Sequence, residues 1–222
     1  MKTGILCAMD SEAAILLENM VNRADYQAPG QCFSTGTLCG QPAVVAVCGI
    51  GKINAALATS LLIERFGADC VINSGIAGGM RPDCPPLSVV LCETVLCHDV
   101  DRALMARYYP FKAEFHSDKA LLDRARAACK KQGLPFTAGT AATGDQLIAD
   151  KAVKQRIIDD CAPHCVDMES AAVGQVCHSF GIPFLVIRTM SDTGEEGFET
   201  INHFEERAAN LSAGILLEML NK

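Results

Sequence analysis

The chain has 222 residues, 50% of them hydrophobic and 20% charged, which is enough for the core of one α/β domain and excludes wholesale disorder. Its net charge of −7 argues against a nucleic-acid partner, because phosphates require a basic face. No run approaches the roughly 18 apolar residues of a membrane span, and Asp10 and Glu12 interrupt any signal peptide at the N-terminus. We therefore expect a single domain over residues 1–222, located in the cytoplasm, without membrane or nucleic-acid partners.

Apolar strand-like runs and helical patterns alternate along the first half of the chain. A strand over 3–8 leads into a helix that ends near Val21 and has Asp10 or Ser11 as its N-cap. The further elements of this half are two strands and one helix, over 31–38, 43–49 and about 53–66.

The second half begins with a fully buried strand over 70–74 that ends in a glycine-rich turn over 75–79. The stretch 98–116 is polar and aromatic, has no clear period and is expected to be a loop. Continuous apolar strands that alternate with helices predict a mostly parallel or mixed sheet covered on both faces. The remaining elements are strands over 87–96, 135–142 and 183–189, and helices over 119–131, 151–160, 168–180 and about 203–220.

The twelve cysteines include no CxxC pair, and many lie within apolar strand-like runs. Free cysteine behaves there as a small hydrophobic residue, and a cytosolic setting keeps it reduced. Cys161, His164 and Cys165 could suggest zinc ligands, but their spacing fits no common zinc site. We therefore expect structural cysteines and no metal.

Three acidic residues stand at the ends of predicted elements, where an α/β sheet binds its ligands. Glu12 follows the first strand, Glu169 begins the helix over 168–180, and Asp192 follows the strand over 183–189. Each could instead be a helix-capping, helix-dipole or turn residue, so none indicates a site by itself. Together they predict that three carboxylates converge at one end of the sheet, where the strands have their carboxyl ends.

Two glycine-rich segments also follow predicted strands. Gly49-Ile50-Gly51-Lys52 resembles half a phosphate loop, but it matches neither GxGxxG nor a Walker sequence, and the segment 75–79 is equally short of both. Because glycines at strand ends also serve tight turns, neither segment predicts a nucleotide by itself.

Taken together, seven segments resemble the bacterial methylthioadenosine/S-adenosylhomocysteine nucleosidases of the purine nucleoside phosphorylase-like superfamily. They occur in collinear order from residue 4 to residue 192, and no single one is decisive. The segments are Gly4-Ile5-Leu6-Cys7-Ala8-Met9-Asp10-Ser11-Glu12, Gly49-Ile50-Gly51-Lys52, Asn73-Ser74-Gly75-Ile76-Ala77-Gly78-Gly79, His98-Asp99-Val100-Asp101, Thr143-Gly144-Asp145, Val166-Asp167-Met168-Glu169-Ser170-Ala171-Ala172 and Arg188-Thr189-Met190-Ser191-Asp192.

This resemblance implies a three-layer α/β sandwich, with a mixed central sheet flanked by helices as in nucleoside phosphorylases and nucleosidases, and a homodimer. It implies an enzyme that hydrolyses the N-glycosidic bond of methylthioadenosine or S-adenosylhomocysteine-type nucleosides and releases adenine and a 5′-thio-ribose. No metal or organic cofactor is required. Such an enzyme would serve methionine salvage, the removal of an inhibitory by-product, or quinone synthesis.

The resemblance also assigns catalytic roles. Adenine is a poor leaving group as an anion, so Asp192 would protonate N7. Glu12 would act as general base on the attacking water, and Glu169 would bind the ribose hydroxyls and stabilise an oxocarbenium-like transition state. The implied substrate-binding residues are Met9, Ile50, Ile76, Leu147, Ile148, Met168, Arg188 and Ser191.

Within that set, Met168 would pack beneath the ribose, and Arg188 and Ser191 would lie around the water and the acid. Backbone groups near Leu147 and Ile148 would contact the adenine edge. Many relatives carry a stacking phenylalanine where Leu147 stands, so this chain lacks an aromatic contribution of about 0.5–1.5 kcal/mol.

A second departure concerns the segment after residue 101, which in the family reaches the partner subunit's site and covers the 5′ group. Here it contains Arg102, Met105 and Arg107. An inward guanidinium would bind a carboxylate on the 5′ substituent, as in homocysteine or futalosine-type nucleosides. The alternative is that both arginines are solvated surface residues.

Other functions stay open at this point: a nucleosidase for futalosine-type nucleosides, a purine nucleoside phosphorylase, or a purine-binding sensor without turnover. A phosphorylase needs converging cations or free amides for phosphate, whereas the first strand is followed by acidic residues, which favours hydrolysis.

Overall fold

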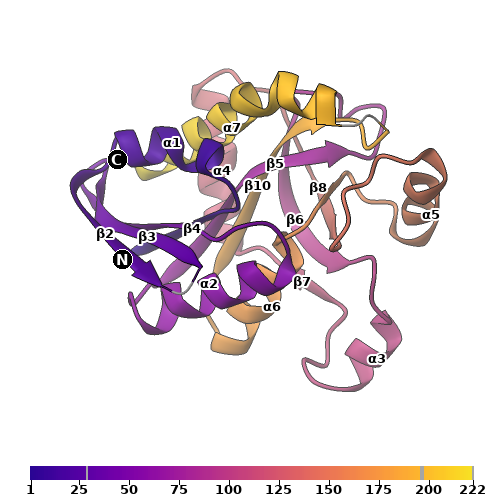
Figure 1. Cartoon of the computed structure of the whole chain (residues 1–222), viewed down its shortest axis with the longest axis horizontal. Helices are drawn as coiled ribbons and strands as arrows, with labels where there is room; N and C mark the ends of the chain where they lie inside the picture. Colours follow the sequence, from indigo (N-terminus) through magenta and orange to yellow (C-terminus); the bar gives the residue numbers. More distant parts are fainter. Residues whose placement is uncertain (29, 196–197, 222) are drawn as a thin grey trace.

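The computed structural model describes residues 1–28, 30–195 and 198–221. A mixed sheet runs through the molecule and has helices on both faces, as Figure 1 shows. This arrangement confirms the expected three-layer fold. One face is covered by α1 (Asp10–Glu18), α4 (Lys119–Lys131) and α7 (Phe198–Leu220), and the other by α2 (Lys52–Glu64) and α6 (Ser170–Phe180).

The strands in the described ranges are β1 (Thr3–Cys7), β2 (Val21–Ala28), β3 (Gln31–Leu38), β4 (Gln41–Val47), β5 (Cys70–Gly79), β6 (Val89–Cys97), β7 (Glu114–His116), β8 (Phe136–Thr143), β9 (Cys165–Asp167) and β10 (Phe184–Asp192). Their order across the sheet is β10–β6–β8–β9–β5–β1–β4–β3–β2, and β7 pairs with β6. At its centre β4, β1, β5 and β10 run parallel.

One end of the sheet closes on itself. β10 pairs with both β5 and β6, so that β5, β10, β6, β8 and β9 form a ring. The short strand β9 joins the ring by pairing in parallel with β8 and antiparallel with β5. Because each of these five strands is paired with two neighbours, the ring itself has no open edge, and only the short strand β7 adds one beside β6.

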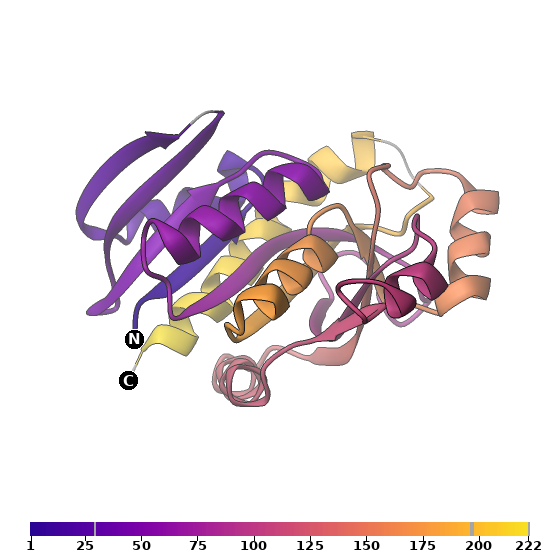
Figure 2. The same cartoon turned by 90° about the horizontal axis from the view of Figure 1, so that it is seen from below.

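The core follows from side-chain alternation along the central strands. In β1, Ile5 belongs to the apolar cluster beneath α1, α4 and α7, and its neighbour Leu6 belongs to the cluster beneath α2 and α6. All residues of β1 and β10 are buried, which explains the apolar runs over 5–7 and 184–187. Seen from below in Figure 2, α2 and α6 lie side by side over the sheet.

Several sequence expectations were wrong in detail. Residues 75–79 are not a turn, because β5 continues through Gly79. The stretch 98–116 contains the helix α3 (Arg102–Arg107) as well as β7. The first helix ends at Glu18, and its N-cap is Met9 instead of Asp10 or Ser11.

β2 was missed altogether, because its sequence VNRADYQA is polar and all but one of its residues are exposed at the edge of the sheet. The remaining helix, α5 (Lys151–Cys161), lies near α3 at one end of the molecule (Figure 1). No helix within the described ranges is long and apolar enough to cross a membrane. The single-domain organisation over 1–222 stays a prediction.

Candidate active site

A cavity of about 250 Å³ opens at the carboxyl ends of β1, β5 and β10, between the starts of α1, α6 and α7. Its walls are mostly apolar, and its lining includes five acidic residues, Glu12, Asp167, Glu169, Asp192 and Glu205. This combination is typical of a site that encloses a small ligand and orients it through a few polar groups. The sequence-predicted residues that line it are Met9, Glu12, Ile50, Ile76, Leu147, Ile148, Met168, Glu169, Ser191 and Asp192.

Glu12 is held in the cavity floor by backbone amides. Its Oε2 accepts hydrogen bonds from the N–H groups of Ala8 (2.7 Å) and Met9 (3.1 Å), and its Oε1 accepts one from Ile76 (2.9 Å). Burial raises the pKa of this carboxyl, while Arg188 and the three amides oppose the rise. A carboxylate has about four lone-pair positions, so Glu12 keeps capacity to accept a proton from a bound water.

The position of Arg188 differs from the sequence prediction, which made this residue a substrate contact. It is 1% exposed and does not line the cavity. Its Nε donates to Asp167 Oδ2 at 2.8 Å, and its Nη2 donates to Asn73 Oδ1 at 2.6 Å and lies 3.6 Å from Glu169 Oε2. The guanidinium thus lies behind the carboxylates, where it lowers the pKa of Asp167 against the effect of burial.

Glu169 is the N-cap residue of α6, and its side chain faces the cavity. Its Oε1 accepts a hydrogen bond from the backbone N–H of Gly51 at 2.9 Å. Burial raises its pKa to about 7, with Arg188 opposing this rise and Asp167 adding to it. A carboxyl group with this pKa exchanges protons near neutral pH.

Asp192 ends β10, and its carboxylate is oriented by its neighbours. Its Oδ2 accepts a hydrogen bond from Ser191 Oγ at 2.8 Å, and its Oδ1 accepts one from the N–H of Gly194 at 2.7 Å. Gly78 of β5 lies against it, since a Cβ at Gly78 would come within 2.9 Å of Asp192 Oδ1. The glycine therefore leaves the space that this carboxylate occupies.

The apolar walls come from segments far apart in the sequence. Met9 precedes α1, Ile50 precedes α2, and Met168 precedes α6, while Leu147 and Ile148 lie in the loop before α5. Leu147 is 42% exposed, whereas Ile148 is buried. Leu147 is therefore a partial cover at the cavity mouth.

Sequence reasoning missed the contribution of α7. Ile201, Asn202 and Glu205, all on the first turns of that helix, also line the cavity. No motif marked them, because they come from an amphipathic helix whose other face packs on the sheet. Asp167 lies within one of the seven family segments but has no predicted role, although it is the main partner of Arg188.

Three other predicted residues, Arg102, Met105 and Arg107, do not line the cavity of their own chain. All three belong to α3, where Arg102 forms an ion pair with Asp160 (Nη1 to Oδ2, 2.6 Å). The guanidinium of Arg107 lies over the ring of Tyr108, at 5.6 Å from its centroid. Their proposed place in a partner's site stays a prediction.

In the described part of the chain, no group of three or more His, Cys, Asp or Glu side chains has a geometry that could hold a metal ion. The polar groups that face the cavity are carboxylates, the Ser191 hydroxyl, the side-chain amides of Gln146 and Asn202, and backbone amides. They can bind hydroxyl groups, transfer protons and stabilise a developing positive charge.

Comparisons with known proteins identify the superfamily and the family of this chain. The family model described as "Phosphorylase superfamily" matches residues 2–221, so fold and site together define a member of that superfamily. A curated relative from Geobacillus thermodenitrificans, a 5′-methylthioadenosine/S-adenosylhomocysteine nucleosidase, is 41% identical over 99% of this chain and 96% of its own length. The chain belongs to the 5′-methylthioadenosine/S-adenosylhomocysteine nucleosidase family.

Solved structures lead to the same family. The Neisseria meningitidis nucleosidase in complex with methylthio-immucillin-A superposes with a TM-score of 0.93 and 33% identity, covering 99% of this chain and 98% of that one. The futalosine hydrolase of Helicobacter pylori is also similar, with a TM-score of 0.92, 30% identity, and coverage of 99% and 97%. Solved structures with this fold therefore include both a 5′-methylthioadenosine/S-adenosylhomocysteine nucleosidase and a futalosine hydrolase.

Proposed function

We propose that this chain hydrolyses the N-glycosidic bond of 5′-methylthioadenosine and S-adenosylhomocysteine-type nucleosides, with Asp192, Glu12 and Glu169 as its catalytic residues. The observation that carries this proposal is the convergence of these three carboxylates on one mostly apolar cavity. Full-length relatives that carry the same family name support the reaction class, a hydrolase acting on an N-glycosidic bond.

Departure of the base requires a proton on adenine. Asp192, oriented by Ser191 and Gly194, donates that proton to N7, so that the base leaves neutral. As the bond breaks, the ribose develops oxocarbenium character. Glu169 accepts hydrogen bonds from the ribose hydroxyls, and its negative charge stabilises this cation.

Water completes the reaction on the side of Glu12. The carboxylate, fixed by the amides of Ala8, Met9 and Ile76, accepts a proton as the water oxygen attacks the anomeric carbon. Arg188 serves as a positioning residue, because it contacts Asp167 and Glu169 from behind the cavity.

Hydrolysis is favoured over phosphorolysis because the backbone amides at the cavity floor already donate hydrogen bonds to Glu12. A phosphate needs free N–H groups or converging cations. The amides of Ala8, Met9 and Ile76 already donate to Glu12, and the charge of Glu12 would repel a phosphate. A non-catalytic sensor is disfavoured because it would need neither the acid nor the base.

We further propose a homodimer in which α3 of one subunit covers the 5′ group in the other. Large apolar side chains are exposed beside the cavity entrance and on α3, including Ile50, Ile53 (82% exposed) and Leu104. Exposed apolar patches of this kind are typical of interfaces. Because Arg102 is paired with Asp160, Arg107 is the arginine of α3 that would approach a 5′ carboxylate.

The dimer is tested by the molar mass in solution and by Ile53→Glu. We expect a dimeric wild type and a monomeric variant with weakened turnover. Arg107→Ala should then reduce turnover of carboxylate-bearing substrates only. A monomeric, fully active wild type would contradict the shared site.

The free state of all twelve cysteines fits the reducing conditions of the cytoplasm, where we place the enzyme. Methionine salvage would use the released 5′-thio-ribose. A futalosine-type substrate is the second candidate, because the similar Helicobacter pylori structure is a futalosine hydrolase.

The deciding experiment is chromatography of products after incubation with methylthioadenosine, S-adenosylhomocysteine, adenosine, inosine and a futalosine analogue, each with and without phosphate. We expect adenine and a free 5′-thio-ribose without phosphate. Ribose 1-phosphate formed only with phosphate would make the enzyme a phosphorylase. Thermal stabilisation by intact nucleoside without any base release would make it a sensor.

A further inference from the structure

An unneutralised carboxylate lies at the rim of the cavity. Glu205 of α7 is half-buried and lines the cavity together with Asn202. Its Oε1 accepts a hydrogen bond from Ser11 Oγ at 2.6 Å. Among the described residues no lysine, arginine or histidine nitrogen lies within 4.0 Å of it, unlike the surface carboxylates of Asp99 and Asp160, which have ion-pair partners.

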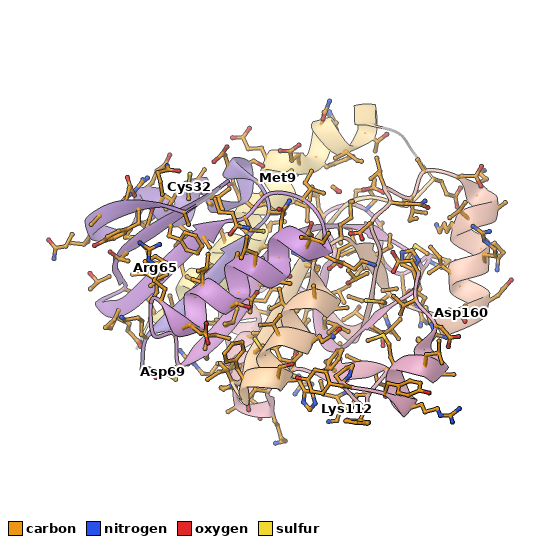
Figure 3. The ribbon with its side chains drawn as sticks, turned by 60° about the horizontal axis from the view of Figure 1, so that its bottom comes forward. Met9, Cys32, Arg65, Asp69, Lys112 and Asp160 are labelled. Atoms are coloured by element: carbon orange, nitrogen blue, oxygen red, sulfur yellow. The ribbon has the colours of Figure 1, made fainter. Side chains whose placement is uncertain are left out.

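The position of Glu205 within the cavity follows from its bond to Ser11. Ser11 lies between Met9 and Glu12 at the start of α1, and α1 packs against α7. Figure 3 shows Met9 beside α7. Asp192, which protonates the base under the proposed function, lies instead against Gly78 and Gly194. Glu205 therefore lies on the Met9 side of the cavity.

We propose that Glu205 is a specificity residue that binds a protonated amine on the 5′ substituent of the substrate. This inference rests on the proposed function, in which the ribose lies against Glu12 and the 5′ group that it carries extends along the Met9 side of the cavity, away from the base that Asp192 protonates. S-adenosylhomocysteine carries such an ammonium group on its 5′ tail, whereas methylthioadenosine carries none. A tail whose only charge is a carboxylate would be repelled by Glu205.

The local chemistry supports one cationic partner. The hydroxyl of Ser11 fixes Oε1, so the carboxylate is oriented before the ligand arrives and its second oxygen remains to accept a charge-assisted hydrogen bond. Most other groups of the cavity wall are apolar and cannot bind a charge. Because Glu205 stands at the rim, solvent screens it, and the effect should be about fivefold and decrease with added salt.

The test compares kcat/KM for methylthioadenosine with that for two analogues, one with a 2-aminoethylthio and one with a 2-carboxyethylthio group at the 5′ position. We expect the wild type to prefer the amine over the carboxylate. Glu205→Gln keeps an acceptor for Ser11 but removes the charge. Relative to methylthioadenosine, it should lose about fivefold on the amine and gain on the carboxylate.

The matched control is Glu206→Gln, because Glu206 is the next residue of α7, is exposed and does not line the cavity. It should leave all three values unchanged. Equal losses on all three substrates in Glu205→Gln, or no change in the amine-to-carboxylate ratio, would overturn the role of Glu205 and leave the nucleosidase reaction standing. Failure of the wild type to hydrolyse methylthioadenosine would instead overturn the proposed function and this inference with it.

Discussion

Gly75 and Glu12 face each other so closely that no side chain fits at Gly75. A Cβ there would overlap Glu12 Oε1 and would come within 2.6 Å of Arg188 Nη1. Gly75 is not among the residues with positive φ, so its backbone conformation does not require glycine. The glycine is needed for space, because the carboxylate of Glu12 and the buried guanidinium of Arg188 both approach β5 at this point.

Gly75→Ala should therefore impair catalysis more than folding. The methyl group displaces the carboxylate of Glu12, and a displacement of about 1 Å can reduce kcat roughly a hundredfold. We expect that reduction, with a loss of about 1–3 kcal/mol in the free energy of unfolding from overpacking. Steady-state kinetics and urea denaturation measure the two effects.

Gly214→Ala is the matched control for that variant. Gly214 lies in α7, and a Cβ there would meet no atom within 4 Å. It should keep its kcat and gain about 0.5–1 kcal/mol, because alanine is the better helix former. A normal kcat in Gly75→Ala would show that catalysis does not depend on this position of the Glu12 carboxylate.

Asp192→Asn should lose most turnover while substrate binding is partly kept, because the amide preserves the shape but cannot protonate N7. General-acid catalysis contributes about 10²–10⁴-fold to a rate. Single-turnover rates and the Kd of adenine would be compared with those of Ser191→Ala, which removes only one hydrogen bond to Asp192. Wild-type rates in Asp192→Asn would remove this residue from the mechanism.

The free energy of unfolding should depend on pH because of Glu169. Burial raises the pKa of Glu169 to about 7 from its ordinary 4.5. A carboxyl group whose pKa rises on folding stabilises the fold most below its unfolded pKa, and that contribution is lost as the pH increases toward the folded pKa. Wild-type protein should therefore lose stability between about pH 4.5 and 7 on account of this group.

Glu169→Gln cannot ionise and so lacks this loss. The free energy of unfolding of the variant minus that of the wild type should increase by roughly 2 kcal/mol from pH 4.5 to 7 and then level off. Urea denaturation at several pH values gives this difference. A constant difference across the range would contradict a raised pKa in the folded state.

Leu147→Phe should strengthen adenine binding, because Leu147 lies at the cavity mouth and is 42% exposed. Stacking on the base adds about 0.5–1.5 kcal/mol, which corresponds to a Kd for adenine about twofold to tenfold lower. Calorimetric titration measures it. Leu147→Met, which fills similar volume without a ring, should change the Kd little, and equal effects of both variants would exclude stacking.

The layered α/β architecture and most of the residues around the cavity could be predicted from the amino-acid sequence. Short apolar runs that alternate with helical patterns indicate strands buried on both faces, and such strands need helices on each side. Since ligands bind at the carboxyl ends of such strands, Glu12, Glu169 and Asp192 could be grouped before any coordinates existed. Their nucleosidase roles came from the family resemblance and remain to be tested.

The closure of the sheet and the positions of Arg188 and Glu205 relative to the three carboxylates depend on the tertiary structure. The ring depends on β9, three residues long, whose pairing with β5 and β8 has no local signal. Arg188 reaches Asp167 because β10 aligns it with Gly75, a register that no single strand encodes. Glu205 enters the cavity because α7 packs against α1, and contacts between segments nearly 200 residues apart depend on packing of the whole chain, not on any local pattern.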